Sequence, residues 1–398
     1  MTKLPLSDLV SAWRSDTPGC EKRTHLNNAG AALQPRPVLE AVTHHLQRET
    51  EIGGYEAAEE AAGAVEQCYI DLGRLLATAA RNVAVVENAT VAVAQALSAF
   101  DFRRGDRIVT TQVDYPSNQI MYLSLARRLG IEVVRAADLP EGGVDPESVR
   151  ELARDPRCRL VALTWVPTNS GLIQDAQAVG ALCEELGVPY LVDACQAVGQ
   201  IPIDARALRC DFLAGTARKF LRGPRGIGFL YVSDRALERG DYPLYVDMLG
   251  AQWTQADEFQ IADGAQRFGN WEFAYALVLG MGAAARYALQ VGPEGIIRTQ
   301  ALAAALRERL AAIPAVTVLD RGAQRCAIVT VAVRGREADE LKRGLRERNV
   351  NTEVSVRESG VIDMDAKGVT SVLRLSPHYY NTEEELELAA ATLEEVLR

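Results

Sequence analysis

Lys219 and Asp193 are the two residues whose types and positions point most directly to chemistry. Lys219 follows the apolar run 212–215 and precedes a Gly/Pro turn, whereas Asp193 closes the apolar run 189–193. A carboxylate at the end of a buried strand is costly unless it meets a positive partner. The pair therefore marks two strand ends where opposite charges could meet. Taken alone, Lys219 is better explained as a surface lysine in a basic loop.

A second candidate group could bind a phosphate. Asn88, Ala89 and Thr90 lie between the predicted strand 83–86 and a predicted helix from residue 91. Free backbone N–H groups at a helix start, together with a hydroxyl, favour an anion. The same pattern is also that of a plain helix cap. The loop around Lys219 has neither a dinucleotide fingerprint nor a GxxxxGK[ST] phosphate loop.

These residues follow strands of a predicted α/β fold. Short apolar runs alternate with helical stretches through most of the chain, which predicts a mainly parallel sheet covered by helices on both faces. In such a sheet ligands bind at the carboxyl ends of the strands. Tyr115 follows one of these ends. The predicted strands are 83–86, 107–113, 132–136, 160–166, 189–193, 212–215 and 227–232.

The pattern changes after about residue 270, which predicts three parts of the chain. Residues 1–20 are expected to be an N-terminal arm, 21–270 a large domain, and 271–398 a linking helix with a small C-terminal α/β domain. The last part contains a predicted helix over 272–312, strands over 327–333 and 371–376, and helices over 338–347 and 383–397. No low-complexity linker separates the parts.

Composition excludes several classes of function. The 398 residues carry a net charge of −10 and 48% hydrophobic residues, which is typical of a globular protein and argues against nucleic-acid binding. No apolar run reaches the roughly 20 residues of a membrane helix. The start of the chain lacks the layout of a signal peptide. Seven cysteines without a CxxC pair and four histidines without ligand spacing predict a cytoplasmic protein with no metal site.

The motifs Asp193-Ala194-Cys195-Gln196 and Thr216-Ala217-Arg218-Lys219 together resemble those of the fold-type I, class V family of pyridoxal 5′-phosphate (PLP) enzymes. The family includes class V aminotransferases, cysteine desulfurases and kynureninase. The resemblance extends from Leu26 to Thr382. It implies PLP as the cofactor, a small-molecule amino-acid substrate, and a homodimer with active sites at the subunit interface.

The resemblance also implies roles for individual residues. Lys219 would hold PLP covalently and move the substrate proton, and Asp193 would keep the pyridine nitrogen protonated so that the ring accepts electrons. Arg374 would bind the substrate carboxylate through two parallel hydrogen bonds, bordered by Asn28 and Gly30. The remaining expected cofactor contacts are Gln196 to the ring's 3′ oxygen, Tyr115 on the ring face, Asn169 near the ring, and Ala89, Thr90, Thr216 and Arg218 at the phosphate.

The chain departs from cysteine desulfurases at the segment before Arg374. Those enzymes need a mobile cysteine there to receive sulfur, but residues 349–360 contain none. Cys326 opens a predicted strand and reads as a small core residue. Cys195 occupies a position usually taken by a small packing residue. Desulfurase activity through a protein persulfide is therefore disfavoured.

Two further segments bear on the substrate. The segment 51–59, with Tyr55, is similar to that of ergothioneine-type C–S lyases, although it could equally be a turn between helices. Trp271 stands where desulfurases usually have Gly-Thr-Pro, and it is expected to shape the substrate pocket. The leading prediction is β-elimination from an S-substituted L-cysteine or its sulfoxide, releasing pyruvate and ammonia. Transamination, epimerisation and a non-catalytic PLP-binding module remain alternatives, and the sulfur substituent is open.

Overall fold

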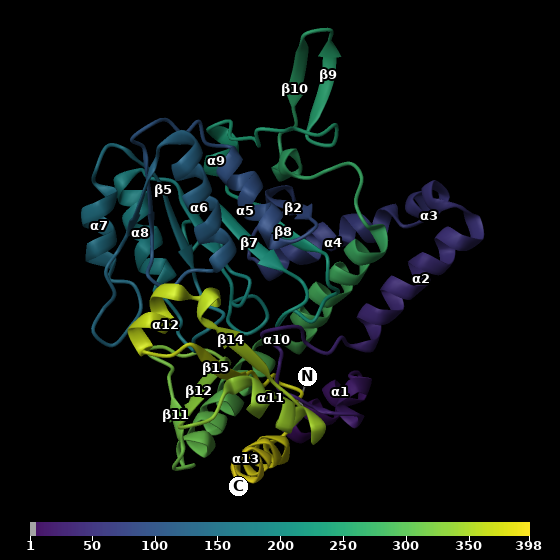
Figure 1. Ribbon diagram of the computed structural model, residues 1–398. Helices are drawn as coiled ribbons and strands as arrows, with labels where there is room; N and C mark the ends of the chain where they lie inside the picture. Colours follow the sequence, from purple (N-terminus) through teal and green to yellow (C-terminus); the bar gives the residue numbers. More distant parts are fainter. Residues whose placement is uncertain (1–4) are drawn as a thin grey trace.

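The computed structural model describes residues 5–398, so residues 1–4 of the predicted N-terminal arm lie outside the described residues. A seven-stranded sheet forms its centre (Figure 1). Six strands run in one direction and β8 runs opposite to both of its neighbours. The predicted mainly parallel α/β sheet is thus confirmed. In spatial order its strands are β2 (Val83–Val86), β8 (Gly228–Val232), β7 (Phe212–Thr216), β6 (Tyr190–Asp193), β5 (Cys158–Thr164), β3 (Arg107–Thr110) and β4 (Glu132–Arg135).

Both faces of this sheet are buried, which explains why its strands read as continuous apolar runs. Successive side chains of a strand point to opposite faces. In β5, Val161 and Leu163 pack into one apolar core, and Leu160 and Ala162 pack into the other. The covering helices are α4 (Ala62–Leu75), α5 (Ala89–Ser98), α6 (Pro116–Leu129), α7 (Pro146–Ala153), α8 (Ala176–Leu186), α9 (Asp234–Glu238) and α10 (Tyr275–Ala311).

The long predicted helix 272–312 is interrupted. Gly292 has φ 66° and ψ −162°, which are not helical values, and Pro293 follows it. Proline lacks the N–H that would continue the helical ladder, and glycine tolerates the positive φ. α10 therefore consists of two helical halves joined by a kink, and both connect the large sheet to the C-terminal region.

The C-terminal region contains a four-stranded antiparallel sheet of order β11-β12-β15-β14. The sequence predicted β12 and β15 but missed the two edge strands, which are short. The strands are β11 (Val316–Val318), β12 (Val329–Val333), β15 (Ser371–Leu375) and β14 (Glu353–Val356). The helices of this region are α11 (Ala338–Glu347), α12 (Val361–Lys367) and α13 (Glu383–Leu397), with the short 3₁₀ helix η4 (Arg357–Ser359) and the two-residue strand β13 (Val350–Asn351).

The beginning of the described chain packs on this C-terminal region. Strand β1 (Thr24–His25) pairs in parallel with β13. Trp13 meets Tyr379 with ring centroids 5.0 Å apart, and Arg14 donates to Glu385 over 2.9 Å. The N-terminal elements are α1 (Leu6–Ser15), η1 (Pro18–Glu21), α2 (Arg36–Ile52) and α3 (Gly54–Glu60).

A two-stranded hairpin, β9 (Ala251–Gln255) and β10 (Glu258–Ile261), projects from the body (Figure 1). The sequence did not predict it. Its side chains are mostly exposed and alternate little between apolar and polar, so the pattern resembles a loop. The segment that follows the hairpin is held by the body, because η3 (Ala265–Phe268) contacts β2, β8 and η2 (Ala80–Asn82).

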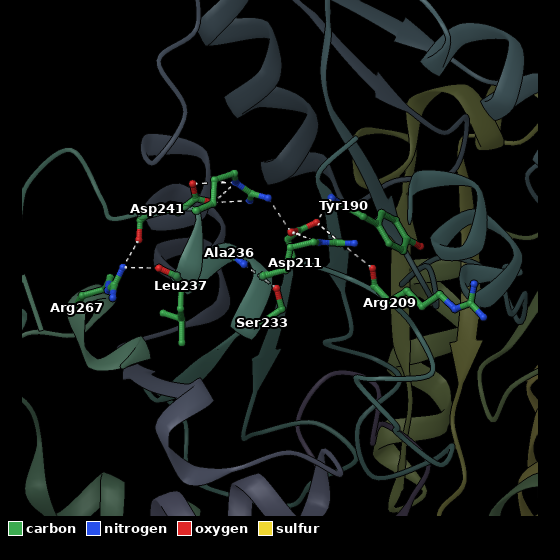
Figure 2. A network of polar contacts seen from close by, with 10 residues as sticks. Tyr190, Arg209, Asp211, Ser233, Ala236, Leu237, Asp241 and Arg267 are labelled. Carbon is green, nitrogen blue, oxygen red and sulfur yellow. Dashed lines mark hydrogen bonds and ion pairs between the residues drawn. The ribbon is translucent and has the colours of Figure 1, made fainter. Parts of the chain in front are cut away.

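A buried polar network anchors the base of this hairpin (Figure 2). Asp211 is fully buried and accepts hydrogen bonds from the Tyr190 backbone N–H at 2.8 Å and from two arginines of the α9 region. Arg267 donates to four backbone carbonyls, including those of Asp241 and Leu237. Because each donor is matched to an acceptor, this network fixes the segment that leads to Trp271.

Candidate functional site

A cavity opens where the sequence placed the chemistry, at the carboxyl ends of β2, β3, β6 and β7. It brings together seven of the predicted site residues from four separate stretches of the chain. This follows from the fold, because parallel strands end at one edge of the sheet. The lining residues are Asn88, Ala89, Thr90, Tyr115, Asn118, Asp193, Cys195, Thr216, Arg218 and Lys219.

Lys219 is a buried lysine that lines this cavity. Its side chain is 6% exposed, and it forms no ion pair within residues 5–398. Its Nζ lies 5.7 Å from the centroid of the Tyr115 ring. Burial lowers the pKa of this amine, and Cys195 and Asp193 oppose that shift. A buried amine with a lowered pKa is more often neutral, which is the nucleophilic and basic form.

Asp193 is held in a fixed orientation. Its Oδ1 accepts from the Cys195 backbone N–H at 2.9 Å, and its Oδ2 accepts from Asn118 Nδ2 at 2.9 Å. The same Asn118 amide lies 3.4 Å from Asp114, a second buried carboxylate. Burial raises the pKa of Asp114, and hydrogen bonds led by that of the Thr164 hydroxyl counteract this. Sequence reasoning missed Asn118, although it lies only three residues after Tyr115.

The phosphate-side residues gather at the start of α5. Asn88 caps this helix by accepting from the Val91 backbone N–H at 3.0 Å. The neighbouring residues Ala89 and Thr90 line the cavity together with Thr216 and Arg218. Burial, followed by the nearby Arg225, lowers the pKa of Arg218. An anion at this point would meet a helix start and a cation at once.

A second cluster lies beside this cavity and is built around Thr168, which the sequence analysis did not assign. Arg374 donates from Nη1 to the Thr168 hydroxyl at 2.8 Å, and Gln196 donates from Nε2 to the same oxygen at 3.1 Å. Arg374 is 5% exposed and forms no ion pair within the described part of the chain. Burial lowers its pKa to about 10. A buried cation of this kind lacks a counter-charge that a bound carboxylate would supply.

Three buried polar atoms in this cluster have no hydrogen-bond partner among residues 5–398. They are Gln196 Oε1, Asn169 Oδ1 and Arg374 Nε. Such groups are rare in folded proteins and indicate a missing ligand. Together with the buried Lys219 and the helix start, they fit a phosphorylated aromatic cofactor and an amino-acid carboxylate.

Asn169 is oriented by the C-terminal region. Its Nδ2 donates to Asp363 Oδ2 at 2.7 Å, and Lys367 Nζ pairs with the same oxygen at 2.7 Å. Asp363 and Lys367 belong to α12, which lies between the two sheets (Figure 1). The carboxylate fixes the amide so that its Nδ2 points to α12. Asp363 could not be anticipated from sequence, because no local pattern links it to residue 169.

Asp138 lies near Asp363, and its partly buried carboxylate is expected to reduce the stability of the fold at neutral pH. Its Oδ1 is buried without a partner, and burial followed by Asp363 raises its pKa to about 6. A carboxyl whose pKa is higher in the folded state stabilises the fold only below its unfolded pKa, and that stability is lost as the pH rises through the folded value.

We therefore expect Asp138→Asn to stabilise the protein at neutral pH. The gain should be about 1 kcal/mol after allowance for solvent screening. It should grow between about pH 4 and pH 6 and then stay constant. Thermal unfolding of both proteins across this range measures it, with the exposed Glu141→Gln as control. A gain of the same size at pH 4 and pH 7.5 would contradict the assignment.

Four other predicted residues are not presented to the cavity by this chain. The Asn28 side chain is fully buried and is used by the fold: it donates to the Ser376 carbonyl at 2.7 Å and accepts from the Tyr380 hydroxyl at 2.5 Å. Gly30 offers its carbonyl to Arg218. Tyr55 is 83% exposed on α3, and Trp271 is 51% exposed.

Within residues 5–398, no helix is long and apolar enough to cross a membrane. That part of the chain also contains no group of three or more His, Cys, Asp or Glu side chains that could hold a metal ion.

Comparison with known proteins agrees with this geometry. The family described as Aminotransferase class-V matches residues 24–388. The chain is 26% identical over 395 residues to a probable cysteine desulfurase of Methanothermobacter thermautotrophicus, covering 96% of this chain and 97% of that protein. It is 28% identical over 394 residues to a probable hercynylcysteine sulfoxide lyase of Mycobacterium tuberculosis, with coverage of 97% and 93%.

Solved structures of the protein C-DES have the same fold. One, a mutant with glycine covalently linked to its PLP cofactor, has a TM-score of 0.85 at 24% identity and covers 96% of this chain and 98% of its own. The other is the complex of this cystine C–S lyase with its reaction product cysteine persulfide, with a TM-score of 0.84, 24% identity and coverage of 95% and 98%. At this identity the likeness concerns the fold.

Proposed function

Because the chain belongs to the aminotransferase class-V family, whose members use PLP, we propose that it is a C–S lyase. Its substrate would be an S-substituted L-cysteine or the corresponding sulfoxide, cleaved by β-elimination. The Cβ–S bond would break, the sulfur fragment would leave as a thiol or, from the sulfoxide, as a sulfenic acid, and water would hydrolyse the three-carbon remainder to pyruvate and ammonia. The proposal concerns the reaction type and substrate class. The identity of the sulfur substituent stays open.

The residues have distinct tasks in this proposal. PLP, when bound, supplies an electron-accepting ring that stabilises negative charge at the substrate α-carbon. Lys219 holds the cofactor and then removes the α-proton, for which its buried, lowered-pKa amine is suited. Asp193 maintains the proton on the ring nitrogen. Arg374 binds the α-carboxylate and thereby orients the bond to be broken.

The cofactor's other groups would be held by residues already near the cavity. The helix start at Ala89 and Thr90, with Thr216 and Arg218, would bind the phosphate. Tyr115 would stack on the ring. Gln196 would bind the ring's 3′ oxygen, and Asn169 would lie beside ring and substrate.

One observation favours elimination over sulfur transfer to the protein. A desulfurase that uses a protein persulfide needs an accessible thiolate. Cys195, the cysteine that lines the cavity, is 9% exposed, and burial raises the pKa of its thiol well above the usual range. Segment 349–368, which precedes Arg374, contains no cysteine. Six of the seven cysteines are buried.

Cysteine desulfurase activity is the main competing proposal, because several relatives of this chain bear that name. The two reactions differ in their carbon product, which is alanine for a desulfurase and pyruvate for the lyase. Purified, PLP-loaded protein should be given S-substituted cysteines and plain L-cysteine separately, with both products assayed. Pyruvate formed preferentially from the S-substituted compounds supports the lyase. Alanine from L-cysteine, without pyruvate, would overturn it.

Transamination and epimerisation share the proton abstraction by Lys219 and differ in where the proton returns. Conversion of the cofactor to its amine form, reversed by a 2-oxo acid, would move the proposal to transamination. Bound PLP whose visible spectrum no amino acid changes would instead indicate a protein that binds PLP without catalysis.

We also propose a homodimer, as the family resemblance implies. Large apolar side chains are exposed on α3, on the hairpin and on the segment after it: Tyr55, Trp253, Phe259 and Trp271. A cavity of about 520 Å³ is lined by residues of α3, α4 and the start of α10. Exposed apolar area of this kind favours association.

Light scattering should give twice the chain mass, and the double variant Trp253→Ser, Phe259→Ser should lower the measured mass towards that of the monomer. A monomeric parent protein would contradict the proposal.

A further inference from the structure

Thr168 occupies a junction between the cofactor side and the carboxylate side of the candidate site. It follows β5, is half-buried, and adjoins the turn at Gly171. That turn is pinned to the C-terminal region, because the Gly171 N–H donates to Asp320 Oδ1 at 3.0 Å. A Cβ at Gly171 would lie 2.6 Å from both Arg307 and the Ile328 carbonyl. The backbone beside Thr168 therefore has little freedom.

The Thr168 hydroxyl has both of its acceptor positions in use. Gln196 Nε2 donates to it at 3.1 Å and Arg374 Nη1 donates to it at 2.8 Å. A threonine hydroxyl has two acceptor lone pairs and one proton. The hydrogen bonds of Thr168 within residues 5–398 leave this proton unused. It is available to an acceptor that is not part of the chain.

The same contacts determine which edge of Arg374 is free. Nη1 donates to the Thr168 carbonyl at 3.0 Å as well as to the hydroxyl, so both of its protons are used. Nε has no partner among the described residues, and Nη2 has one contact, to Asn27 Oδ1 at 3.3 Å. Nε and Nη2 form one edge of the guanidinium. That edge has the spacing for two parallel hydrogen bonds to a carboxylate.

We propose that Thr168 is a positioning residue. Its hydroxyl and carbonyl use both protons of Arg374 Nη1, so that the Nε–Nη2 edge is left for the α-carboxylate of the bound amino acid, and the same hydroxyl holds Gln196. The proposal deepens the proposed function, since it rests on the amino-acid site of that function. It also couples carboxylate binding by Arg374 to the position of Gln196, because both side chains donate to the Thr168 hydroxyl oxygen.

Two variants separate the hydroxyl from the shape of the side chain. Thr168→Val removes the hydroxyl and keeps the branched shape, and Thr168→Ser keeps the hydroxyl. Each PLP-loaded protein is titrated with L-alanine and with L-alaninamide, and the visible absorbance of the cofactor reports binding. Alanine has the carboxylate, whereas alaninamide lacks its charge. The ratio of the two dissociation constants therefore measures carboxylate recognition.

The ratio should favour alanine strongly in the parent protein and fall about tenfold in Thr168→Val, as expected for loss of charge-assisted hydrogen bonds. Thr168→Ser should stay within about threefold of the parent. A general loss of structure would weaken both ligands equally, so an unchanged ratio in Thr168→Val overturns the proposal. If Thr168→Val does not fold, Thr168→Ala takes its place under the same criterion.

This titration does not depend on bond cleavage. Neither alanine nor alaninamide has a leaving group on Cβ, so the ratio can be measured whether or not the protein is a C–S lyase. Failure of the lyase proposal would appear as absent pyruvate from S-substituted cysteines. Failure of the Thr168 proposal would appear as an unchanged carboxylate preference.

Discussion

Lys219→Ala is expected to reduce turnover by at least about 10³-fold and to remove the visible absorbance of covalently held cofactor. The reason is geometric and electrostatic. The Lys219 amine is buried in the cavity without an ion-pair partner within residues 5–398, and burial lowers its pKa. Among residues 5–398, no other lysine lines that cavity. Absorbance spectra and product formation measure the two effects separately.

Two variants control this result. Lys219→Arg keeps the positive charge but lacks a primary amine, so it should be as inactive as Lys219→Ala. Lys367→Ala removes another buried lysine, one that pairs with Asp363 on α12, and should retain covalently held cofactor. Turnover by Lys219→Ala near the parent rate would remove the proposed mechanism.

Asp193→Asn is expected to have the second largest effect, a fall in kcat of about 10³-fold. The substitution preserves size and removes the charge that would keep the ring nitrogen protonated. In the parent protein, the Cys195 N–H and Asn118 hold both carboxylate oxygens. The carboxylate therefore cannot rotate away from the cavity. The measurement is kcat together with the cofactor content of the purified variant.

Asp114→Asn is the matched control for Asp193→Asn. Asp114 is also buried and also contacts Asn118, but it does not line the cavity. Its loss should perturb stability more than kcat, because its oxygens accept from Thr110 at 2.8 Å and from Gln119 at 2.9 Å. Equal losses of kcat in both variants would mean that the cluster acts through structure alone, against the role proposed for Asp193.

The sequence alone determined the class of fold and the strand ends that carry chemistry. Every predicted strand of the large sheet has a counterpart, since burial on both faces makes these strands continuous apolar runs. Asp193 and Lys219 could be singled out because Asp193 closes one such run and Lys219 lies shortly after another. Helix starts such as that at Asn88 are similarly local, since a cap depends on three or four consecutive residues.

Contacts between distant segments were decided only by the tertiary structure. Asn28 was predicted beside the carboxylate, but packing against Ser376 and Tyr380 uses all of its amide. Thr168 was not predicted as a site residue, and it contacts Gln196 and Arg374 because the fold brings the end of β5 close to β15. The exposure of Tyr55 and the projection of the hairpin were equally invisible in the sequence. Periodicity records which face of an element is buried, whereas hydrogen-bond partners depend on where the other elements lie.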